Sequence, residues 1–231
     1  MTKRNVVIIL AGGVGKRAGF DIPKQFCTIS GKTVLEYSVE AFERNPNIDE
    51  IAIVSNHDYL KDVHAIVTKN KWKKTKNILC GGKERYESSL NAINAYNETI
   101  NIIFHDAARP LVSQRIIDDV ASALNSHEAV AVALPSSDTV FLTDDNIISS
   151  IPERKRMMLA QTPQAFDIDI IRNAYKLALA DQTFVATDDC GVVKRYTPDV
   201  PIFIVKGDRT NIKLTYKEDV AVIDLFMHTT M

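Results

Sequence analysis

Short runs of consecutive apolar residues recur along the chain, each bounded by turn-forming residues. They cover residues 6–10, 51–54, 100–104, 129–134 and 202–205. Strands that are buried on both faces of a parallel sheet produce this pattern. Between the runs, apolar residues recur at helical spacing over 34–42, 88–96 and 116–124. Strands alternating with helices predict an α/β fold, a Rossmann-like three-layer arrangement with a mainly parallel sheet.

The pattern changes between residues 136 and 165. Two short apolar stretches, 140–142 and 147–148, flank Thr143-Asp144-Asp145-Asn146, which is typical of a hairpin turn. We therefore predict a β-arm at about 136–165 that projects from the main sheet. The sequence contains no internal repeat or low-complexity linker, so residues 1–231 are interpreted as a single domain with this arm.

Composition narrows the class of protein. Apolar residues make up 45% and charged residues 25%, and the formal net charge is −1. These values are typical of a soluble globular protein and give no electrostatic reason to expect nucleic acid or a membrane as partner. Cys27, Cys80 and Cys190 form no C-x-x-C pair, which suits a reducing cytoplasm. The first apolar run is too short for a signal peptide and no segment could span a bilayer, so we expect a cytoplasmic protein.

The first apolar run leads directly into a glycine-rich segment, Leu10-Ala11-Gly12-Gly13-Val14-Gly15-Lys16-Arg17. Glycines let backbone N–H groups approach an anion closely, and Lys24 follows as a further cation. This combination indicates a polyphosphate-binding loop. A tight strand-to-helix turn with solvated basic residues explains the glycines alone about equally well.

Two familiar nucleotide-binding motifs do not fit this segment. The P-loop pattern requires Ser or Thr after Gly-Lys, but Arg17 follows Lys16. The dinucleotide fingerprint G-x-G-x-x-G fails because Gly19 falls one position late. The loop therefore belongs to neither motif.

Asp106 follows the apolar run 100–104 almost directly. Ligands of parallel α/β sheets bind beyond the carboxyl ends of the strands, where a carboxylate beside a triphosphate is a natural Mg²⁺ ligand. A helix N-cap or a turn is the structural alternative for Asp106. The neighbouring His105 is interpreted as a structural hydrogen-bonding residue and has no part in the predicted mechanism.

Two further segments carry weaker signals. The Gly81-Gly82 turn brings backbone close to another group, and Arg85 and Ser88 would open the next helix toward the same site. Lys213 follows the last apolar run. Taken alone, Ser88 could be an ordinary capping residue and Lys213 an ordinary solvated charge.

Together these segments resemble one family over nearly the whole chain. Seven motifs occur in the order found in the cytidylyltransferases: LAGGxGxR, IPKQF, GGxxR, HDAxRP, QTPQAF (161–166), TDD (187–189) and NIKLT. The family includes enzymes that act on 2-C-methyl-D-erythritol 4-phosphate and on ribitol 5-phosphate. The resemblance implies that CTP and a polyol phosphate react, with Mg²⁺, to give a CDP-polyol and pyrophosphate.

The resemblance also implies residue roles. Arg17, Lys24 and Lys213 would be catalytic, with Arg17 and Lys24 on the triphosphate and Lys213 beside the attacking phosphate. The nucleotide would contact Leu10, Ala11, Gly12, Gly13, Gly15, Gly82, Arg85, Ser88 and Asp106, with Asp106 also holding Mg²⁺. The acceptor would contact Arg109, Thr139, Arg154, Thr162 and Thr187. Because Arg154 matches an arm residue that reaches the partner subunit's site in the family, the resemblance also implies a homodimer through the arm.

The acceptor is less well defined. The motifs TDD and AQTPQAF are frequent in the methylerythritol enzymes. The opening LAGG and the run Met157-Met158-Leu159, which replaces a usual Leu-Trp pair, resemble the ribitol-type enzymes of capsule and teichoic acid pathways. We favour ribitol 5-phosphate, with 2-C-methyl-D-erythritol 4-phosphate of isoprenoid biosynthesis as the alternative. A non-catalytic nucleotide-binding protein is disfavoured because Arg17, Lys24, Asp106 and Lys213 are all present, and a sugar 1-phosphate enzyme is disfavoured by HDAARP and QTPQAF.

Overall fold

The computed structural model describes residues 3–13, 22–185 and 188–229. In this part of the chain, seven strands form one sheet. In spatial order they are β11 (Phe203–Lys206), β7 (Ala129–Pro135), β10 (Met158–Asp167), β6 (Asn101–Asp106), β1 (Asn5–Ala11), β4 (Glu50–Ser55) and β5 (Thr75–Cys80). Only β10 runs antiparallel to its neighbours among these strands. The predicted α/β fold with a mainly parallel sheet is confirmed.

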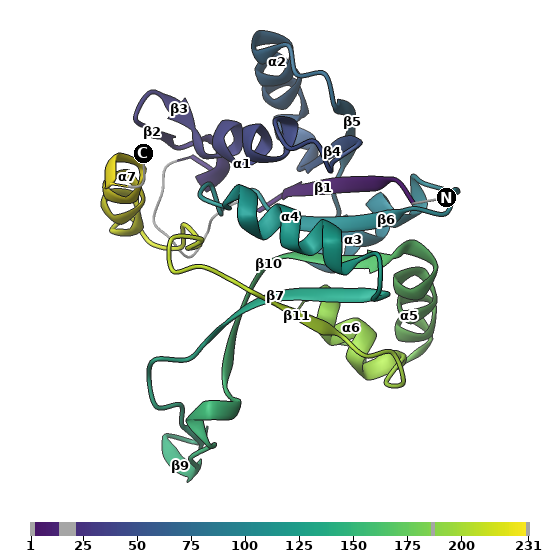
Figure 1. Ribbon diagram of the computed structural model, residues 1–231, viewed down its shortest axis with the longest axis vertical. Coiled ribbons are helices and arrows are strands. Elements are labelled where there is room, and N and C mark those ends of the chain that lie inside the picture. The colour runs from purple at the N-terminus through teal and green to yellow at the C-terminus, as the bar shows by residue number, and fades with distance from the viewer. Residues whose placement is uncertain (1–2, 14–21, 186–187, 230–231) are drawn as a thin grey trace.

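Helices cover both faces of the sheet, which gives the three layers (Figure 1). One face packs against α1 (Val34–Glu43), α2 (Leu60–Asn70) and α4 (Gln114–Ala123), and the other against α3 (Arg85–Asn94), α5 (Ile168–Ala180) and α6 (Asp189–Tyr196). Strand β1 shows why both faces are buried: Val7 and Ile9 enter the first core, and Val6 and Ile8 enter the second. A consecutive apolar run is the sequence signature of this arrangement.

A third, smaller apolar cluster attaches the C-terminal helix α7 (Asp219–Thr229) to the segment after β1. Its buried members include Cys27, Ile29 and Val34 from the first part of the chain and Leu214 and Ile223 from the last. The short helix η1 (Lys24–Phe26) and the small hairpin of β2 (Thr28–Ile29) and β3 (Lys32–Thr33) belong to the same region. This packing holds residues 24–29 against residues 212–215, which matters for the site.

Residues 136–157 leave the sheet between β7 and β10 and project from it as an arm (Figure 1). Within the arm, β8 (Leu142–Asp144) pairs with β9 (Ile147–Ser150), and η3 (Arg154–Arg156) follows. The turn residues Asp145 and Asn146 both have positive φ, of 46° and 67°. Asp and Asn tolerate this backbone region, so a two-residue hairpin turn forms here as predicted.

The arm is shorter than the predicted 136–165. Residues 158–165 belong to β10, which pairs with β7 on one side and β6 on the other. Their glutamines and Pro163 interrupt the apolar pattern expected for a central strand. The pairing of β10 with β7 shifts register between Gln161 and Gln164, so the strand accommodates Pro163 at an irregularity.

Within residues 3–13, 22–185 and 188–229, no helix has both the length and the apolar character to cross a bilayer.

Candidate active site

The candidate site lies at the carboxyl ends of the parallel strands β1, β4 and β6. The sheet register sets Leu10 beside Asp106 and Ala11 beside Ser55, so the three strands end together. Gly12 and Gly13 follow β1 immediately at this edge. Three loops therefore leave the sheet side by side, which is where parallel α/β sheets bind ligands.

The two glycine turns predicted to bind nucleotide lie next to each other. The Gly81 N–H donates to the Ser55 carbonyl at 2.8 Å, so the pairing between β4 and β5 extends one residue beyond the end of β5. The Gly82 N–H donates to Ser88 Oγ at 3.2 Å, and a Cβ on Gly12 would lie 3.5 Å from the same oxygen. A Cβ on Gly82 would come within 2.1 Å of Glu87 Cβ, so only glycine fits there. Gly12, Gly82 and Ser88 thus form one wall.

Asp106 lies at the centre of a group of cations. Its carboxylate is 2.7 Å from Lys213 Nζ, 3.6 Å from Arg85 Nε and 4.0 Å from Arg109 Nε. Burial opposes ionisation of this side chain, which is 12% exposed, but the three cations outweigh that effect. The pKa of Asp106 is therefore held well below its usual range, and the residue is a carboxylate at neutral pH.

Lys24, the first residue of η1, contacts the segment that carries Lys213. Its ammonium donates to the carbonyls of Leu214 and Thr215, at 3.3 and 3.4 Å. The Leu214 N–H in turn donates to the Ala108 carbonyl at 2.8 Å, so the segment carrying Lys213 is anchored beside Asp106. The structure therefore assembles Lys24, Lys213 and Asp106 from three distant parts of the sequence.

Arg17, Gly15 and Thr187, which the sequence assigns to the site, lie outside the described residues. Leu10 and Ala11 form the end of β1, and Gly13 follows them as an exposed residue. The Ala11 carbonyl accepts a hydrogen bond from the buried Gln25 side chain at 2.6 Å. The described part of the glycine-rich segment is thus fixed to η1, next to Lys24.

The chain that carries these residues matches one protein family over nearly its whole length. The profile described as "IspD: 2-C-methyl-D-erythritol 4-phosphate cytidylyltransferase" matches residues 5–229 of this chain. The chain belongs to this family. It is accordingly an enzyme of the nucleotidyltransferase class.

Individual cytidylyltransferases are similar over their full length. The 2-C-methyl-D-erythritol 4-phosphate cytidylyltransferase of Thermobifida fusca is 43% identical, covering 98% of this chain and 94% of that protein. The crystal structure of 4-diphosphocytidyl-2C-methyl-D-erythritol synthase from Anaerococcus prevotii superimposes with a TM-score of 0.86 at 29% identity, covering 98% of this chain and 96% of the other.

A third relative has a different name. The bifunctional ribulose 5-phosphate reductase/CDP-ribitol pyrophosphorylase of Haemophilus influenzae is 40% identical over 96% of this chain. The match covers 48% of that protein, so this chain spans about half its length.

Within this cytidylyltransferase, Arg85 is held from behind by a carboxylate for which the sequence suggested no separate role. Asp189, the last residue of TDD, is fully buried; its carboxylate accepts from Arg85 Nη1 and from the Tyr175 hydroxyl, both at 2.7 Å. The Asp189 charge raises the pKa of Arg85 against the effect of burial, so the guanidinium stays charged. The contact between Asp189 and Arg85 is seen only in the structure, since the sequence pattern does not indicate which residue Asp189 contacts.

The residues predicted for the acceptor are divided between the sheet and the arm. Thr162 is buried in β10, and Arg109 lies in the turn after β6. Thr139 and Arg154 are exposed on the arm, where Arg154 Nη1 donates to the Ser137 carbonyl at 3.5 Å. Figure 1 shows that the arm extends away from the sheet, so these residues lie on two different parts of the chain.

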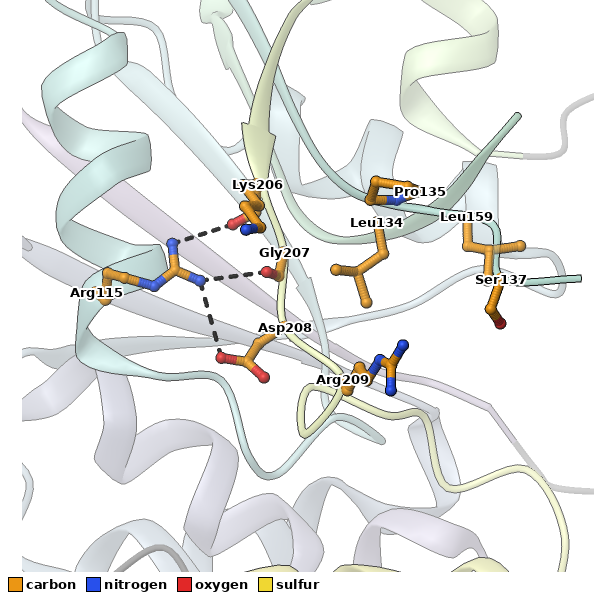
Figure 2. Close-up of a pocket in the computed structure, with 9 residues that line it drawn as sticks. All are labelled: Arg115, Leu134, Pro135, Ser137, Leu159, Lys206, Gly207, Asp208 and Arg209. Atoms are coloured by element: carbon orange, nitrogen blue, oxygen red, sulfur yellow. Dashed lines mark hydrogen bonds and ion pairs between the residues drawn. The ribbon is translucent and has the colours of Figure 1, made fainter. Parts of the chain in front are cut away.

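A separate hollow of about 680 Å³ lies at the base of the arm. Figure 2 shows Arg115 bonded across it to the carbonyls of Lys206 and Gly207 and paired with Asp208. Its lining consists of Arg115, Leu134, Pro135, Ser137, Leu159, Lys206, Gly207, Asp208 and Arg209. None of these residues was predicted for the site. The hollow is therefore distinct from the Asp106 cluster.

Proposed function

We propose that this enzyme transfers CMP from CTP to 2-C-methyl-D-erythritol 4-phosphate and releases pyrophosphate. The observation that carries the proposal is the group of cations around Asp106 beside the two glycine turns. A triphosphate and a phosphate monoester bring several negative charges to one place, and the cations at the strand ends can neutralise these charges.

The proposed reaction is a direct displacement. A phosphate oxygen of the acceptor attacks the α-phosphorus of CTP, the bond from that phosphorus to the bridging oxygen of the β-phosphate breaks, and pyrophosphate leaves with the electron pair. Catalysis of this kind needs positioning and charge neutralisation, with no protein nucleophile. We assign Arg17 and Lys24 to the triphosphate and Lys213 to the attacking phosphate. Gly12, Gly82, Arg85 and Ser88 would surround the nucleotide.

Mg²⁺ belongs to the proposal as well. Asp106 Oδ2 receives the Lys213 ammonium, whereas Oδ1 has Arg85 Nε at 3.6 Å, beyond hydrogen-bond distance. That leaves Oδ1 able to bind a hard cation. The residues the structure describes contain no group of three or more His, Cys, Asp or Glu side chains fit to hold a metal. One carboxylate plus phosphate oxygens and water suits Mg²⁺, which would neutralise triphosphate charge when bound.

The choice of acceptor differs from the one favoured on sequence. Ribitol 5-phosphate was preferred there, but the family profile and the 43% identical relative are both named for 2-C-methyl-D-erythritol 4-phosphate. Ribitol 5-phosphate stays as the second candidate because of the 40% identical relative named as a CDP-ribitol pyrophosphorylase.

An acceptor screen tests this proposal. Purified enzyme with CTP and Mg²⁺ is expected to release pyrophosphate with a kcat/KM for 2-C-methyl-D-erythritol 4-phosphate at least about 10-fold above that for ribitol 5-phosphate, a difference of about 1.4 kcal/mol in transition-state binding. The reverse order would assign the enzyme to ribitol 5-phosphate. Turnover of neither acceptor with CTP would refute cytidyl transfer to both.

We further propose that the enzyme is a homodimer whose arm completes the partner's acceptor site. Several large apolar side chains on the arm are exposed, among them Ile147 at 73% and Ile151 at 59%. Exposed apolar surface of this kind is typical of an interface. Arg154, on the same arm, would then reach the acceptor phosphate of the other subunit.

Mixing two inactive variants tests this arrangement. Arg154→Ala and Lys213→Ala are each expected to be inactive, and co-refolded mixtures should recover about a quarter of wild-type activity. Half of randomly mixed dimers are mixed, and each mixed dimer carries one complete site. Mixtures that stay inactive while light scattering shows dimers would place Arg154 and Lys213 in the same subunit's site. A monomer in light scattering would rule out the shared site.

A further inference from the structure

Strand β10 brings Thr162 beside Asp106 by register. Gln164 pairs with Phe104 in the antiparallel ladder, so Thr162 lies opposite Asp106, where β6 ends. The Asp106 N–H donates to Thr162 Oγ1 at 3.1 Å, and the Thr162 carbonyl instead accepts from Asn211 Nδ2 at 2.9 Å. The threonine side chain therefore supplies the hydrogen bond that backbone would normally supply at this point of a ladder.

The hydroxyl proton of Thr162 is also used in a hydrogen bond within the protein. Thr162 Oγ1 lies 3.0 Å from His105 Nδ1, and His105 Nε2 lies 3.0 Å from the Arg109 carbonyl. A carbonyl has no proton to give, so Nε2 carries the ring proton of the neutral imidazole and Nδ1 accepts from Thr162. Thr162 thus accepts from Asp106 and donates to His105, and its single proton points into the protein.

The surroundings of His105 keep its ring neutral. The residue is fully buried and its ring packs edge-on against Phe42, with ring centroids 4.9 Å apart. Both ring nitrogens face neutral groups, the Thr162 hydroxyl and the Arg109 carbonyl, so a protonated ring would be a buried charge with no counter-ion in contact with it. The ring therefore accepts at Nδ1 at neutral pH.

The same contacts fix the backbone on both sides of Asp106. Its N–H is held by Thr162, and its carbonyl accepts from the Arg109 N–H at 3.0 Å. His105 holds the end of this turn through the Arg109 carbonyl. The orientation of the Asp106 carboxylate toward Lys213 thus depends on two side chains that lie behind it.

We infer that Thr162 and His105 are positioning residues that hold Asp106 and the Arg109 turn in place, and that Thr162 gives no hydroxyl proton to the acceptor phosphate. The inference rests on the proposed function. It changes the role that the family resemblance suggests for Thr162, because a side chain that is 4% exposed and donates its one hydroxyl proton to His105 has no proton left to donate to a phosphate.

Steady-state kinetics of two Thr162 variants separate the two roles. Thr162→Val keeps the shape and removes the hydroxyl, and it is expected to lower kcat about 10-fold or more while the KM for the acceptor changes less than about 2-fold. Thr162→Ser keeps Oγ and should stay within about 2-fold of wild type in both. A direct phosphate contact would instead raise the KM of Thr162→Val for the acceptor and leave kcat nearly unchanged, which would overturn the inference.

Combining variants tests whether His105 acts through Thr162. His105→Phe should reproduce the kcat loss, and His105→Phe with Thr162→Val should lose little more than either alone, because coupled residues are not additive. Full additivity would contradict the coupling. Thr75→Val is the matched control, since Thr75 is a buried strand residue at the start of β5. If Thr75→Val lowered kcat as much as Thr162→Val, the effect would be general loss of packing, and positioning of Asp106 would be refuted.

A measurement without substrate distinguishes failure of this inference from failure of the proposed function. Two-bond ¹H–¹⁵N NMR spectra of the imidazoles should show His105 as the Nε2–H tautomer in the wild-type enzyme and in Thr162→Ser. The ¹⁵N shift of Nδ1 should move in Thr162→Val as that nitrogen loses its donor. A protonated Nδ1 in the wild type, or an unchanged spectrum in Thr162→Val, would overturn the inference whatever the acceptor screen gives.

Discussion

Replacing Lys24 with methionine is expected to lower kcat by about 10²- to 10³-fold while the fold is retained. Removal of one group that stabilises developing charge typically costs this much. Methionine keeps most of the aliphatic stem and removes the ammonium, so the packing of η1 against residues 212–215 should persist. The two hydrogen bonds from Lys24 to Leu214 and Thr215 are long, at 3.3 and 3.4 Å, and their loss should lower the thermal midpoint only slightly.

Lys32→Met provides the matched control for Lys24→Met. Lys32 lies in β3 of the same region and pairs with Glu40 at 2.7 Å, with 44% of its side chain exposed. The Lys32→Met variant should stay as folded as the wild type, because an exposed ion pair contributes little to stability. Its kcat should therefore stay within about 2-fold of wild type, since Lys32 has no role in the proposed reaction. Measuring pyrophosphate release for both variants at saturating CTP shows whether loss of the Lys24 ammonium lowers kcat specifically. Normal turnover in Lys24→Met would remove Lys24 from the leaving-group side of the reaction.

The strands that sequence patterning predicted and missed differ in a physical way. Strands β1, β4, β6, β7 and β11 coincide with the five apolar runs, and four of them lie inside the sheet. Strand β5 was missed because Lys76 and Asn77 interrupt its apolar residues, whereas β11, at the other edge of the sheet, begins with three consecutive apolar residues. An edge strand has one side without a neighbour and need not be continuously apolar.

Strand β10 was missed because it buries polar side chains. It is a central strand, yet Gln161, Thr162 and Gln164 are buried in it at 7%, 4% and 2% exposure. Each has a partner from a distant segment: Asp208 for Gln161, Asp106 and His105 for Thr162, and Asp188 for Gln164. Local pattern treats such residues as surface or loop, because the partners that permit burial are far away in sequence.

The candidate site divides in the same manner. That Gly12, Gly82 and Asp106 share one edge follows from the parallel topology, which was predicted from the sequence. His105 was predicted to make a structural hydrogen bond, but its partner Thr162 and the contact of Asp189 with Arg85 could not be predicted, since they join β6 to β10 and α6 to α3. Asp189 and His105 stand in the motifs TDD and HDAxRP, but the motifs do not say which side chain each of them contacts.

The second large effect is expected at the ion pair between Asp106 and Lys213. Asp106→Asn should lower kcat by about 10²- to 10³-fold, because it removes the charge that holds Lys213, Arg85 and Arg109 together. Breaking a buried charge cluster from its anionic side leaves the cations to repel one another, and Lys213 should turn away from its position 2.7 Å from the carboxylate. Lys213→Met should lose activity to a similar extent through the missing ammonium.

A double-mutant cycle determines whether these two residues act as a unit. If Asp106 works by orienting Lys213, Asp106→Asn with Lys213→Met should be scarcely slower than the worse single variant. The Mg²⁺ concentration that gives half-maximal rate separates the second role proposed for Asp106: it should rise in Asp106→Asn and stay unchanged in Lys213→Met. Asp208→Asn, which alters a half-exposed carboxylate paired with Arg115 at 3.9 Å, is the control and should keep kcat within about 2-fold. Additive losses would show that Asp106 and Lys213 act independently, and an unchanged Mg²⁺ dependence in Asp106→Asn would exclude Asp106 as the metal ligand.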